Sequence, residues 1–330
     1  MFSFILIFAM ILALIFSFWT GFTDAAYAIS TVIGTRTLKP IQAVGLATLG
    51  NFIGMIFGSA VAVTIGTSII SESITSGEVI VAALAGALIF DVIFSWILSL
   101  PISETHVLIG GLVGAGAAAG GLNVVKVEGI IDKVVIPMIT SPFIAIIITF
   151  FVGCLIIRLF MNFRPSRINK YFKRLQIVSA LFFSITDGTN DAQKMMGIMT
   201  ALLLYYGYIS EFSVPFWVML ASYITLSLGT FLGGWKVVKT MATKITHLRP
   251  YQGFSAEVTS SLILGTTAIL GMPVSSTHVA NGSIIGVGLC QRTKAVKWGM
   301  TRKIVWAWIL SMPLSAVFSF IIFNAIKFFV

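Results

Sequence analysis

The stretch PISETHVLIGGLVGAG, residues 101–116, decides the fold because the chain carries it twice. The second copy, PVSSTHVANGSIIGVG, occupies residues 273–288, and eight of the sixteen aligned positions are identical, among them Pro, Ser, Thr and His. Both copies lie in almost wholly apolar surroundings, where polar side chains are costly and require a reason. A duplicated polar motif in an apolar chain is typical of secondary transporters built from two related halves, with the substrate site between them.

The composition places the chain in a membrane. Of its 330 residues, 58% are hydrophobic and only 10% are charged, and the mean hydropathy is +1.02. Soluble domains carry about 25% charged residues, so this chain has too little polar surface to face water. We expect an integral membrane protein whose spans are α-helices of about 20 residues each.

The basic residues give the chain a net charge of +10 without forming a basic domain. They gather in short loops between apolar runs, which argues against nucleic acid as a partner and is typical of cytoplasmic loops. Four loops hold Arg36 and Lys39; Arg158, Arg164, Arg167, Lys170, Lys173 and Arg174; Lys236, Lys239, Lys244 and Arg249; and Arg292, Lys294, Lys297, Arg302 and Lys303. The other loops hold Glu72, Glu78, Glu128, Asp132 and Glu211. We therefore expect a multi-pass protein of the cell membrane with cytoplasmic basic loops and both termini outside.

Ten apolar runs follow one another along the chain. Those long enough to cross a bilayer occupy residues 2–34, 41–66, 79–100, 134–158, 175–206, 214–235, 255–271 and 304–328, and shorter ones occupy 105–120 and 277–290. Two short polar clusters, residues 20–24 and 186–191, interrupt the first and fifth runs; we call them knots. They align at an offset of 167 residues, so that Gly21 matches Gly188 and Asp24 matches Asp191. Because glycine weakens a helix, we expect both helices to unwind there and to free carbonyl groups.

The two motif pairs divide the chain into repeats. They occur in the same order at nearly the same offset, which predicts a first membrane repeat at residues 1–160, a basic cytoplasmic linker at 161–174 and a second repeat at 175–330. An odd number of spans in each repeat inverts the second relative to the first. The predicted fold is an all-α integral membrane protein, an inverted-repeat helical bundle with broken helices and two helical hairpins. Hydropathy leaves open whether the hairpins, at 79–120 and 255–290, cross the membrane fully.

Each Pro-x-Ser-x-Thr-His motif has the chemistry of an anion site. Proline disfavours helix at the residue before it, and Ser or Thr caps the helix that begins beside His106 or His278. The N-terminus of such a helix presents free N–H groups and the positive end of the helix dipole. Two such termini facing each other could hold a tetrahedral oxyanion; the alternative is that the hydroxyls only cap the hairpin helices. Each copy also carries a glycine pair that favours close helix packing: Gly110 with Gly114, and Gly282 with Gly286.

Acidic side chains are concentrated in or beside the apolar runs. They are Asp24, Asp91, Glu104, Asp187, Asp191 and Glu257. A carboxylate in such surroundings must pair with a cation or take up a proton, and carboxylates beside an anion site would otherwise repel the anion. Co-bound Na⁺ or H⁺ resolves that conflict; an internal ion pair of Asp187 or Asp191 with Lys194 is the alternative. The two histidines either carry protons or simply donate to a helix carbonyl.

These motifs resemble those of the inorganic phosphate transporter (PiT) family. The matching stretches are residues 21–24 (GFTD), 187–194 (DGTNDAQK), 252–257 (QGFSAE) and 273–278 (PVSSTH), and the resemblance spans essentially the whole chain. It implies a symporter that carries inorganic phosphate with Na⁺ or H⁺, without enzymatic chemistry and without a cofactor. A sulfate or other oxyanion transporter of the same family is the alternative. A membrane-embedded enzyme or a passive channel fits the duplicated site less well.

The resemblance also implies partners and site residues. The partners are phosphate or sulfate, membrane lipid and a second copy of the chain in a homodimer. The substrate-binding residues would be Thr23, Ser103, Thr105, Asn190, Ser275, Ser276 and Thr277. Cation or proton coupling would fall to Asp24, Asp187, Asp191 and Glu104, with Asp24 and Asp191 as ligands of Na⁺.

The first half departs from the family pattern at three positions. Thr23 and Tyr27 stand where the family usually has asparagine, and Glu104 stands where it has threonine. The loss of two amides and the gain of a carboxylate alter the first cation site. Glu104 could instead take up a proton, which would favour H⁺ coupling.

Overall fold

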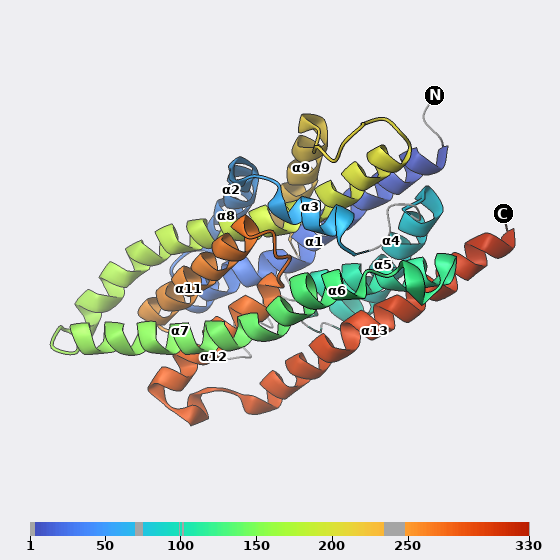
Figure 1. Ribbon diagram of the computed structural model, residues 1–330. Coiled ribbons are helices and arrows are strands. Elements are labelled where there is room, and N and C mark those ends of the chain that lie inside the picture. The colour runs from blue at the N-terminus through green and yellow to red at the C-terminus, as the bar shows by residue number, and fades with distance from the viewer. Residues whose placement is uncertain (1–3, 70–74, 99, 101, 234–247, 330) are drawn as a thin grey trace.

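The computed structural model describes residues 4–69, 75–98, 100, 102–233 and 248–329, which form a bundle of helices without a β-strand in the described part of the chain (Figure 1). The first half comprises α1 (Phe4–Gly34), α2 (Pro40–Ile53), η1 (Gly54–Phe57), α3 (Ala60–Thr67), α4 (Gly77–Asp91), η3 (Val92–Ile97), α5 (Glu104–Gly120), η4 (Leu122–Val124), α6 (Val127–Ile130), η5 (Ile131–Val135) and α7 (Ile136–Phe160). The second comprises α8 (Pro165–Tyr205), α9 (Phe216–Leu232), α11 (Pro250–Ile269), α12 (Ser276–Gln291), η6 (Thr293–Ala295) and α13 (Trp298–Phe329). Four of the loop residues that serve to predict the orientation lie outside the described residues: Glu72, Lys236, Lys239 and Lys244.

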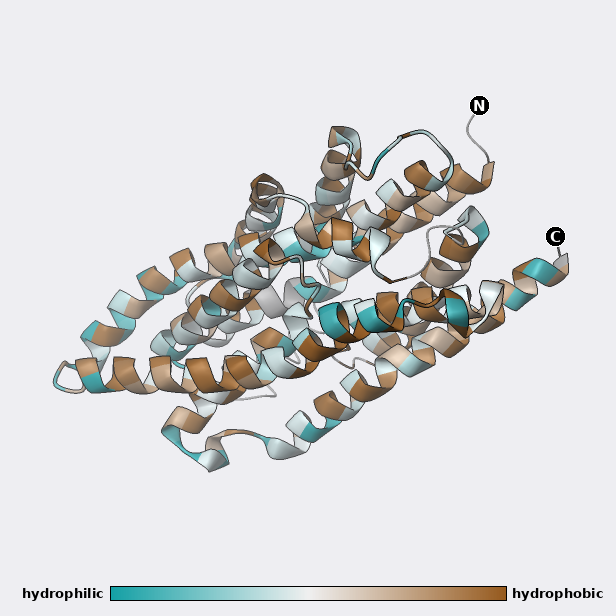
Figure 2. Cartoon of the chain, in the orientation of Figure 1, coloured by the Kyte–Doolittle hydropathy of each residue, from teal (hydrophilic) through white to brown (hydrophobic). Residues whose placement is uncertain are grey.

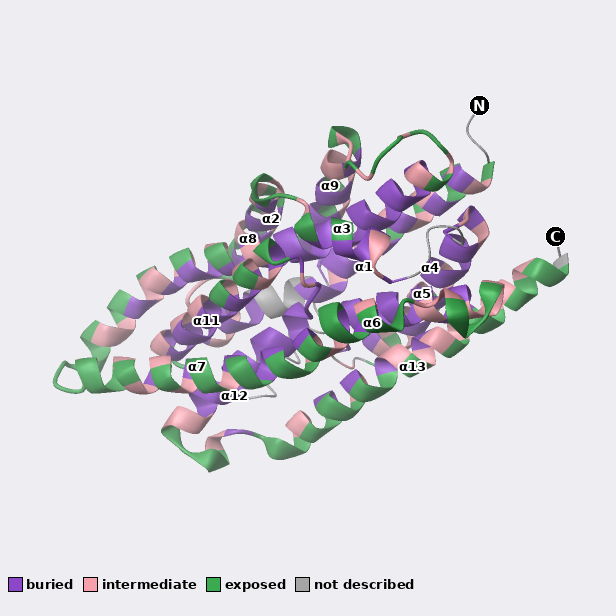
Figure 3. Ribbon diagram, in the orientation of Figure 1, coloured by how far each residue is buried: buried purple, intermediate pink, exposed green. Residues whose placement is uncertain are grey.

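The outer helices of the bundle are apolar and expose hydrophobic side chains. The segments long and apolar enough to span a membrane are Phe4–Gly34, Pro40–Phe57, Gly77–Ile97, Val127–Phe160 and Trp298–Phe328 among the described residues. Hydrophobic residues predominate on the ribbon of α7 and alternate with paler ones along α13 (Figure 2), and exposed residues recur along both helices (Figure 3). Phe143 and Phe151 on α7, for example, are 62% and 65% exposed. Such an apolar exterior is stable only in lipid, which confirms a membrane protein.

Most predicted spans correspond to helices, with one division. The run 41–66 is not a single helix, because it separates into α2, η1 and α3. Gly58 between η1 and α3 has φ of 92°, a left-handed conformation that glycine adopts without strain and that ends the first segment. Proline begins α2, α8 and α11, where its missing N–H costs nothing.

The prediction that the helices unwind at the two polar knots is wrong. Both α1 and α8 run through their knots as α-helix. The glycines serve close contact instead: a Cβ atom at Gly21 would overlap the backbone of Leu226 on α9, and one at Gly188 would overlap Asn51 on α2. Each knot therefore packs tightly against a helix of the other repeat, and the missing side chain permits that approach.

The two repeats exchange their last helices. The last helix of the first repeat, α7, packs along α12 of the second, and α13 packs along α5 of the first. The predicted glycine pairs form both seams. Cβ atoms at Gly110 and Gly114 would overlap carbonyl groups of α13, and Cβ atoms at Gly282 and Gly286 would overlap those of α7. The prediction of close packing at these glycines is confirmed, and each hairpin is held by the other repeat.

Candidate functional site

The tips of the two hairpins meet inside the bundle. Helix α5 begins at Glu104 and α12 at Ser276, directly after the turns that close the two hairpins. Thr105 Oγ1 on the first tip donates to the carbonyl of Val274 on the second, at 3.2 Å. The tip residues Ser103, Val274 and Ser275 are at most 1% exposed. Both hairpins therefore turn in the interior of the bundle.

The serines of the duplicated motif cap the hairpin helices, as predicted. Ser103 Oγ accepts from the backbone N–H of His106, and Ser275 Oγ accepts from that of His278, both at 3.3 Å. Each hydroxyl satisfies one of the free N–H groups of its helix and keeps its own hydrogen to donate. The capping function holds for both serines, and the two helix N-termini open toward the same interior region.

The histidines hold the hairpins against the exchanged helices. His106 Nδ1 lies 3.0 Å from the carbonyl oxygen of Trp308 on α13, and His278 Nδ1 lies 3.3 Å from that of Met138 on α7. A carbonyl only accepts, so in each ring Nδ1 carries the hydrogen. This confirms the alternative in which the histidines donate to helix carbonyls.

Helix α8 contacts the second tip as well. Asn190 Nδ2 donates to the carbonyl of Val274 at 2.7 Å, so this carbonyl joins the first hairpin, the second hairpin and α8. Most residues of the two knots are buried, and only Thr186 on α8 and Phe22 on α1 are half-buried. The Asn190 contact brings the α8 knot to the tip of the second hairpin.

Five carboxyl groups are buried around the tips. Asp24, Asp91, Glu104, Asp187 and Asp191 are each at most 3% exposed. Asp24 lies close enough to Asp191, Glu104 and Asp187 to interact with them electrostatically. Ser276 Oγ reaches Asp24 Oδ2 at 3.5 Å, which is a long contact for a hydrogen bond. So many carboxylates cannot all stay ionised in a buried region without cations.

One cation of the chain itself enters this cluster. Lys194 Nζ lies 2.5 Å from Asp191 Oδ1, and both side chains are 2% exposed. The ion-pair alternative is therefore confirmed for Asp191, and one ammonium group leaves most of the carboxylates without a fixed positive partner.

Two departures from the family pattern contact each other. Thr23 Oγ1 lies 2.8 Å from Glu104 Oε1, a hydrogen bond from α1 to the tip of the first hairpin. The hydroxyl also lies near the carbonyls of Trp19 and Thr20. The third departure, Tyr27, has a side chain outside the described part of the structure. In this chain a hydroxyl–carboxyl contact thus occupies the position where the pattern has an amide and a hydroxyl.

Several oxygen atoms at the site have no hydrogen-bond partner among the described residues. These atoms are Asp24 Oδ1, Glu104 Oε2, Asp187 Oδ1, Asn190 Oδ1 and Thr277 Oγ1. Buried polar atoms are usually paired, so unpaired oxygens converging in one region point to a ligand that supplies donors or positive charge. Oxygen ligands of this kind suit Na⁺ or a proton. Among the described residues, no group of three or more His, Cys, Asp or Glu side chains is arranged to hold a metal ion on its own.

Sequence reasoning left two members of the cluster out of the candidate site, although it named Asp91 among the acids of the apolar runs. Asp91 ends α4 just before the π-helix η3, and its carboxyl group lies beside that of Glu104. The other member is the Val274 carbonyl, which accepts from both Thr105 and Asn190. The π-helix, a feature frequent at functional sites, was the signal for Asp91, but it cannot be read from composition.

Glu257 belongs to a separate cluster. Its carboxyl group accepts from Thr31 and Gln176, at 2.5 and 3.0 Å, and from Ser179. Thr31 is on α1 and the other two are on α8, so this acid ties α11 to both knot-bearing helices. Its oxygens are satisfied by neutral donors, in contrast to those of the central carboxyl groups.

Comparison with known proteins decides the family. Residues 20–165 and 161–319 each match the phosphate transporter family. The chain belongs to this family. The match includes both knots and both hairpin tips, so the duplicated segments are family features in this chain.

Curated relatives share most of its length. A probable low-affinity inorganic phosphate transporter of Rhizobium meliloti is 43% identical over 309 residues, covering 93% of this chain and 92% of that protein. A Bacillus subtilis protein of the same description is 39% identical with the same coverage. A solved structure described as the sodium-dependent phosphate transporter superposes with a TM-score of 0.87 at 25% identity, covering 99% of this chain and 100% of the other. The all-α inverted-repeat fold is thereby confirmed, and the relatives are transporters rather than enzymes.

Proposed function

We propose that this family member is a symporter that moves inorganic phosphate across the cell membrane together with Na⁺ or H⁺. The observation that carries the proposal is the meeting of two symmetry-related hairpin tips beside five buried carboxyl groups. Helix N-termini favour an anion, whereas the carboxylates repel one. A bound cation or proton reconciles the two and makes anion binding depend on the coupling ion.

The substrate groups in this proposal are the hydroxyls and the amide around the tips. Phosphate oxygens would accept from the Thr277 hydroxyl, and from the Thr105 and Ser276 hydroxyls after these turn away from the Val274 carbonyl and Asp24. Ser103 and Ser275 position the helices that supply N–H groups. Asn190 fixes α8 against the second tip through the Val274 carbonyl. Thr23 completes the proposed set through its contact with Glu104.

The coupling groups differ between the two repeats. In the second repeat, Asp191 is partly neutralised by Lys194, and Asp187 has an unpaired oxygen. In the first repeat, Asp24 with its unpaired Oδ1 is the carboxylate proposed to hold Na⁺ together with Asp191. The solved relative described as sodium-dependent supports Na⁺.

A proton at Glu104 is the second coupling mode. Glu104 lies beside Asp91, and two carboxyl groups at such close range are stable when they share one proton. Glutamate at this position departs from the family pattern, so this chain carries a proton acceptor that the pattern lacks. H⁺ coupling through Glu104 is therefore specific to the first repeat of this chain.

Transport would proceed by alternating access between the inverted repeats. We propose both termini outside and the basic loops in the cytoplasm, as the loop charges predict. The repeat boundaries at residues 1–160 and 175–330, the linker at 161–174 and the homodimer stay predictions.

The test is uptake by purified protein in proteoliposomes. Labelled phosphate should accumulate under an imposed inward Na⁺ or H⁺ gradient and should leave again when an ionophore collapses that gradient. Labelled sulfate tested in parallel separates the phosphate transporter from a sulfate transporter of the same family. Gradient-independent equilibration of both anions would contradict symport.

A further inference from the structure

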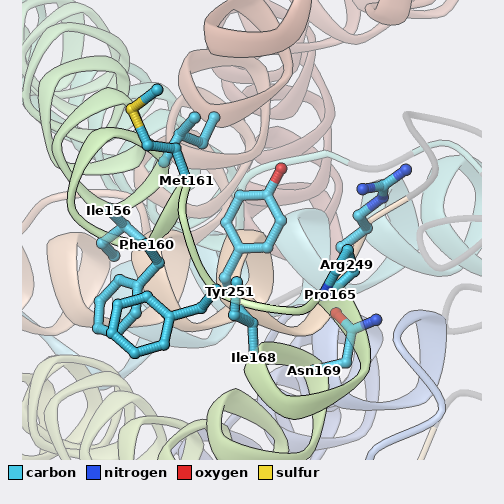
Figure 4. Close-up of a pocket in the computed structure, with 10 residues that line it drawn as sticks. Ile156, Phe160, Met161, Pro165, Ile168, Asn169, Arg249 and Tyr251 are labelled. Carbon is cyan, nitrogen blue, oxygen red and sulfur yellow. The ribbon is translucent and has the colours of Figure 1, made fainter.

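A pocket lies at the end of the bundle where α7, α8 and α11 come together, away from the hairpin tips. Its walls are the last turns of α7, the turn that follows and the first turns of α8 and α11. Figure 4 shows Arg249 and Asn169 toward one end of the pocket and Ile156, Phe160 and Met161 toward the other, with Tyr251 between them. The pocket is thus amphipathic along its length.

The apolar half of the pocket faces the surroundings of the bundle. Ile157 and Met161 are 38% and 70% exposed, and Phe163 beside them is exposed as well. Aromatic rings support this wall from behind: Phe160 contacts Phe172, and Phe172 contacts Tyr251. Exposed apolar surface at the edge of a membrane bundle suits the acyl chain of a lipid.

The polar half carries a positive charge without a negative partner. Arg249 is the charged residue among those that line the pocket, and it is exposed. The chain has no acidic residue between Asp132 and Asp187, and none between Glu211 and Glu257. Arg158, Arg164, Arg167 and Lys170 border the pocket in sequence and are exposed too. An anion is therefore the ligand that this end of the pocket attracts.

We propose that this pocket binds one anionic phospholipid, with its phosphate at Arg249 and Asn169 and an acyl chain along Ile156, Ile157 and Met161. Basic pockets between membrane helices on the cytoplasmic side bind anionic headgroups. The basic residues of the α7–α8 turn add to the attraction by charge alone. The lipid would connect the end of the first repeat with the starts of α8 and α11 in the second, independently of the transport site.

The test is lipid binding to the purified full-length protein in detergent. Dioleoyl phosphatidylglycerol is titrated while the thermal unfolding midpoint is recorded, with dioleoyl phosphatidylcholine as the neutral lipid that has the same chains. A saturable rise in the midpoint is expected with the anionic lipid alone. Arg249→Gln should raise the half-saturating concentration about fivefold, since a basic residue near an anionic surface contributes roughly 1 kcal/mol.

Two further variants locate the effect. Lys294→Gln, an exposed charge change in η6 outside the pocket, should leave the titration unchanged. Ile157→Trp should weaken the lipid effect by filling the apolar half without changing charge. Inorganic phosphate should not reproduce the effect that Arg249→Gln removes.

The proposal is overturned if Arg249→Gln and Lys294→Gln titrate alike, or if the neutral lipid acts as well as the anionic one. It is also overturned if phosphate alone gives the Arg249-dependent shift. A change in oligomeric mass on Arg249→Gln, with no lipid effect in the wild type, would assign the pocket to a second copy of the chain instead. All of these outcomes are independent of phosphate uptake, so they leave the proposed transport function untouched.

Discussion

The imidazole rings of His106 and His278 lie edge to face with their centroids 4.5 Å apart. These residues hold matching places in the two copies of the duplicated segment, 172 positions apart. Equivalent residues that touch mark the place where the two inverted repeats face each other. A second such pair is Asn51 and Thr230, which hold the same place in the similar stretches LGNFIG (residues 49–54) and LGTFLG (residues 228–233). The Asn51 side-chain amide donates to the Thr230 hydroxyl at 2.8 Å.

The contact of His278 with the Met138 carbonyl predicts a structural role for this histidine, which the side-chain amide of an asparagine can take over. Asparagine places its N–H close to the position of Nδ1, so His278→Asn should keep the bond to Met138 and retain most phosphate uptake. His278→Leu leaves that carbonyl without a donor and should lower the free energy of unfolding by about 1–3 kcal/mol. Thermal unfolding and the pH profile of uptake check both. A pH profile that flattens in His278→Asn would instead identify the ring as a proton carrier.

Glu104→Gln should separate the two coupling modes. Glutamine retains an acceptor for the Thr23 hydroxyl but cannot take up or release a proton. Uptake driven by a pH gradient should be lost, while uptake driven by Na⁺ persists. Glu128→Gln, a matched change at an exposed position in α6, is the control and should behave as the wild type. Unchanged pH-gradient-driven uptake in Glu104→Gln would remove Glu104 from the coupling scheme.

Lys194→Met should destabilise the protein because it leaves Asp191 buried beside other carboxylates. Breaking one side of a buried ion pair costs about 3–5 kcal/mol. The double variant Asp191→Asn/Lys194→Met should recover much of that loss in thermal unfolding while it remains defective in uptake. Lys133→Met, at an exposed position, provides the control. If the double variant is no more stable than Lys194→Met, the pair does not account for the cost.

Gly114→Ala should weaken the seam between α5 and α13. Its added Cβ would overlap the carbonyl of Ala316, and overpacking of this kind costs about 1–3 kcal/mol. Gly45→Ala is the matched control, because nothing lies within 4 Å of a Cβ at that position; it should be neutral or slightly stabilising. Equal unfolding midpoints for the two variants would show that the seam is not closely packed.

The sequence predicted the spans well because length and apolarity of a segment suffice for that purpose. Its duplicated motif also predicted the capping serines, since capping depends on local residues alone. The knots were misjudged because the contact that Gly21 permits lies on α9, more than 200 residues away in the chain. The hydrogen bond between Thr23 and Glu104 and the exchange of α7 and α13 are likewise tertiary relationships, which no local pattern contains.

The most direct test of the account is to locate bound phosphate in an experimental structure of the protein with phosphate and Na⁺ present. The account predicts oxyanion density between the hairpin tips, within hydrogen-bonding reach of Thr105, Ser276 and Thr277. Removal of the coupling ion should abolish that density. Phosphate bound away from the tips, or bound between them equally well without Na⁺ and at high pH, would contradict it.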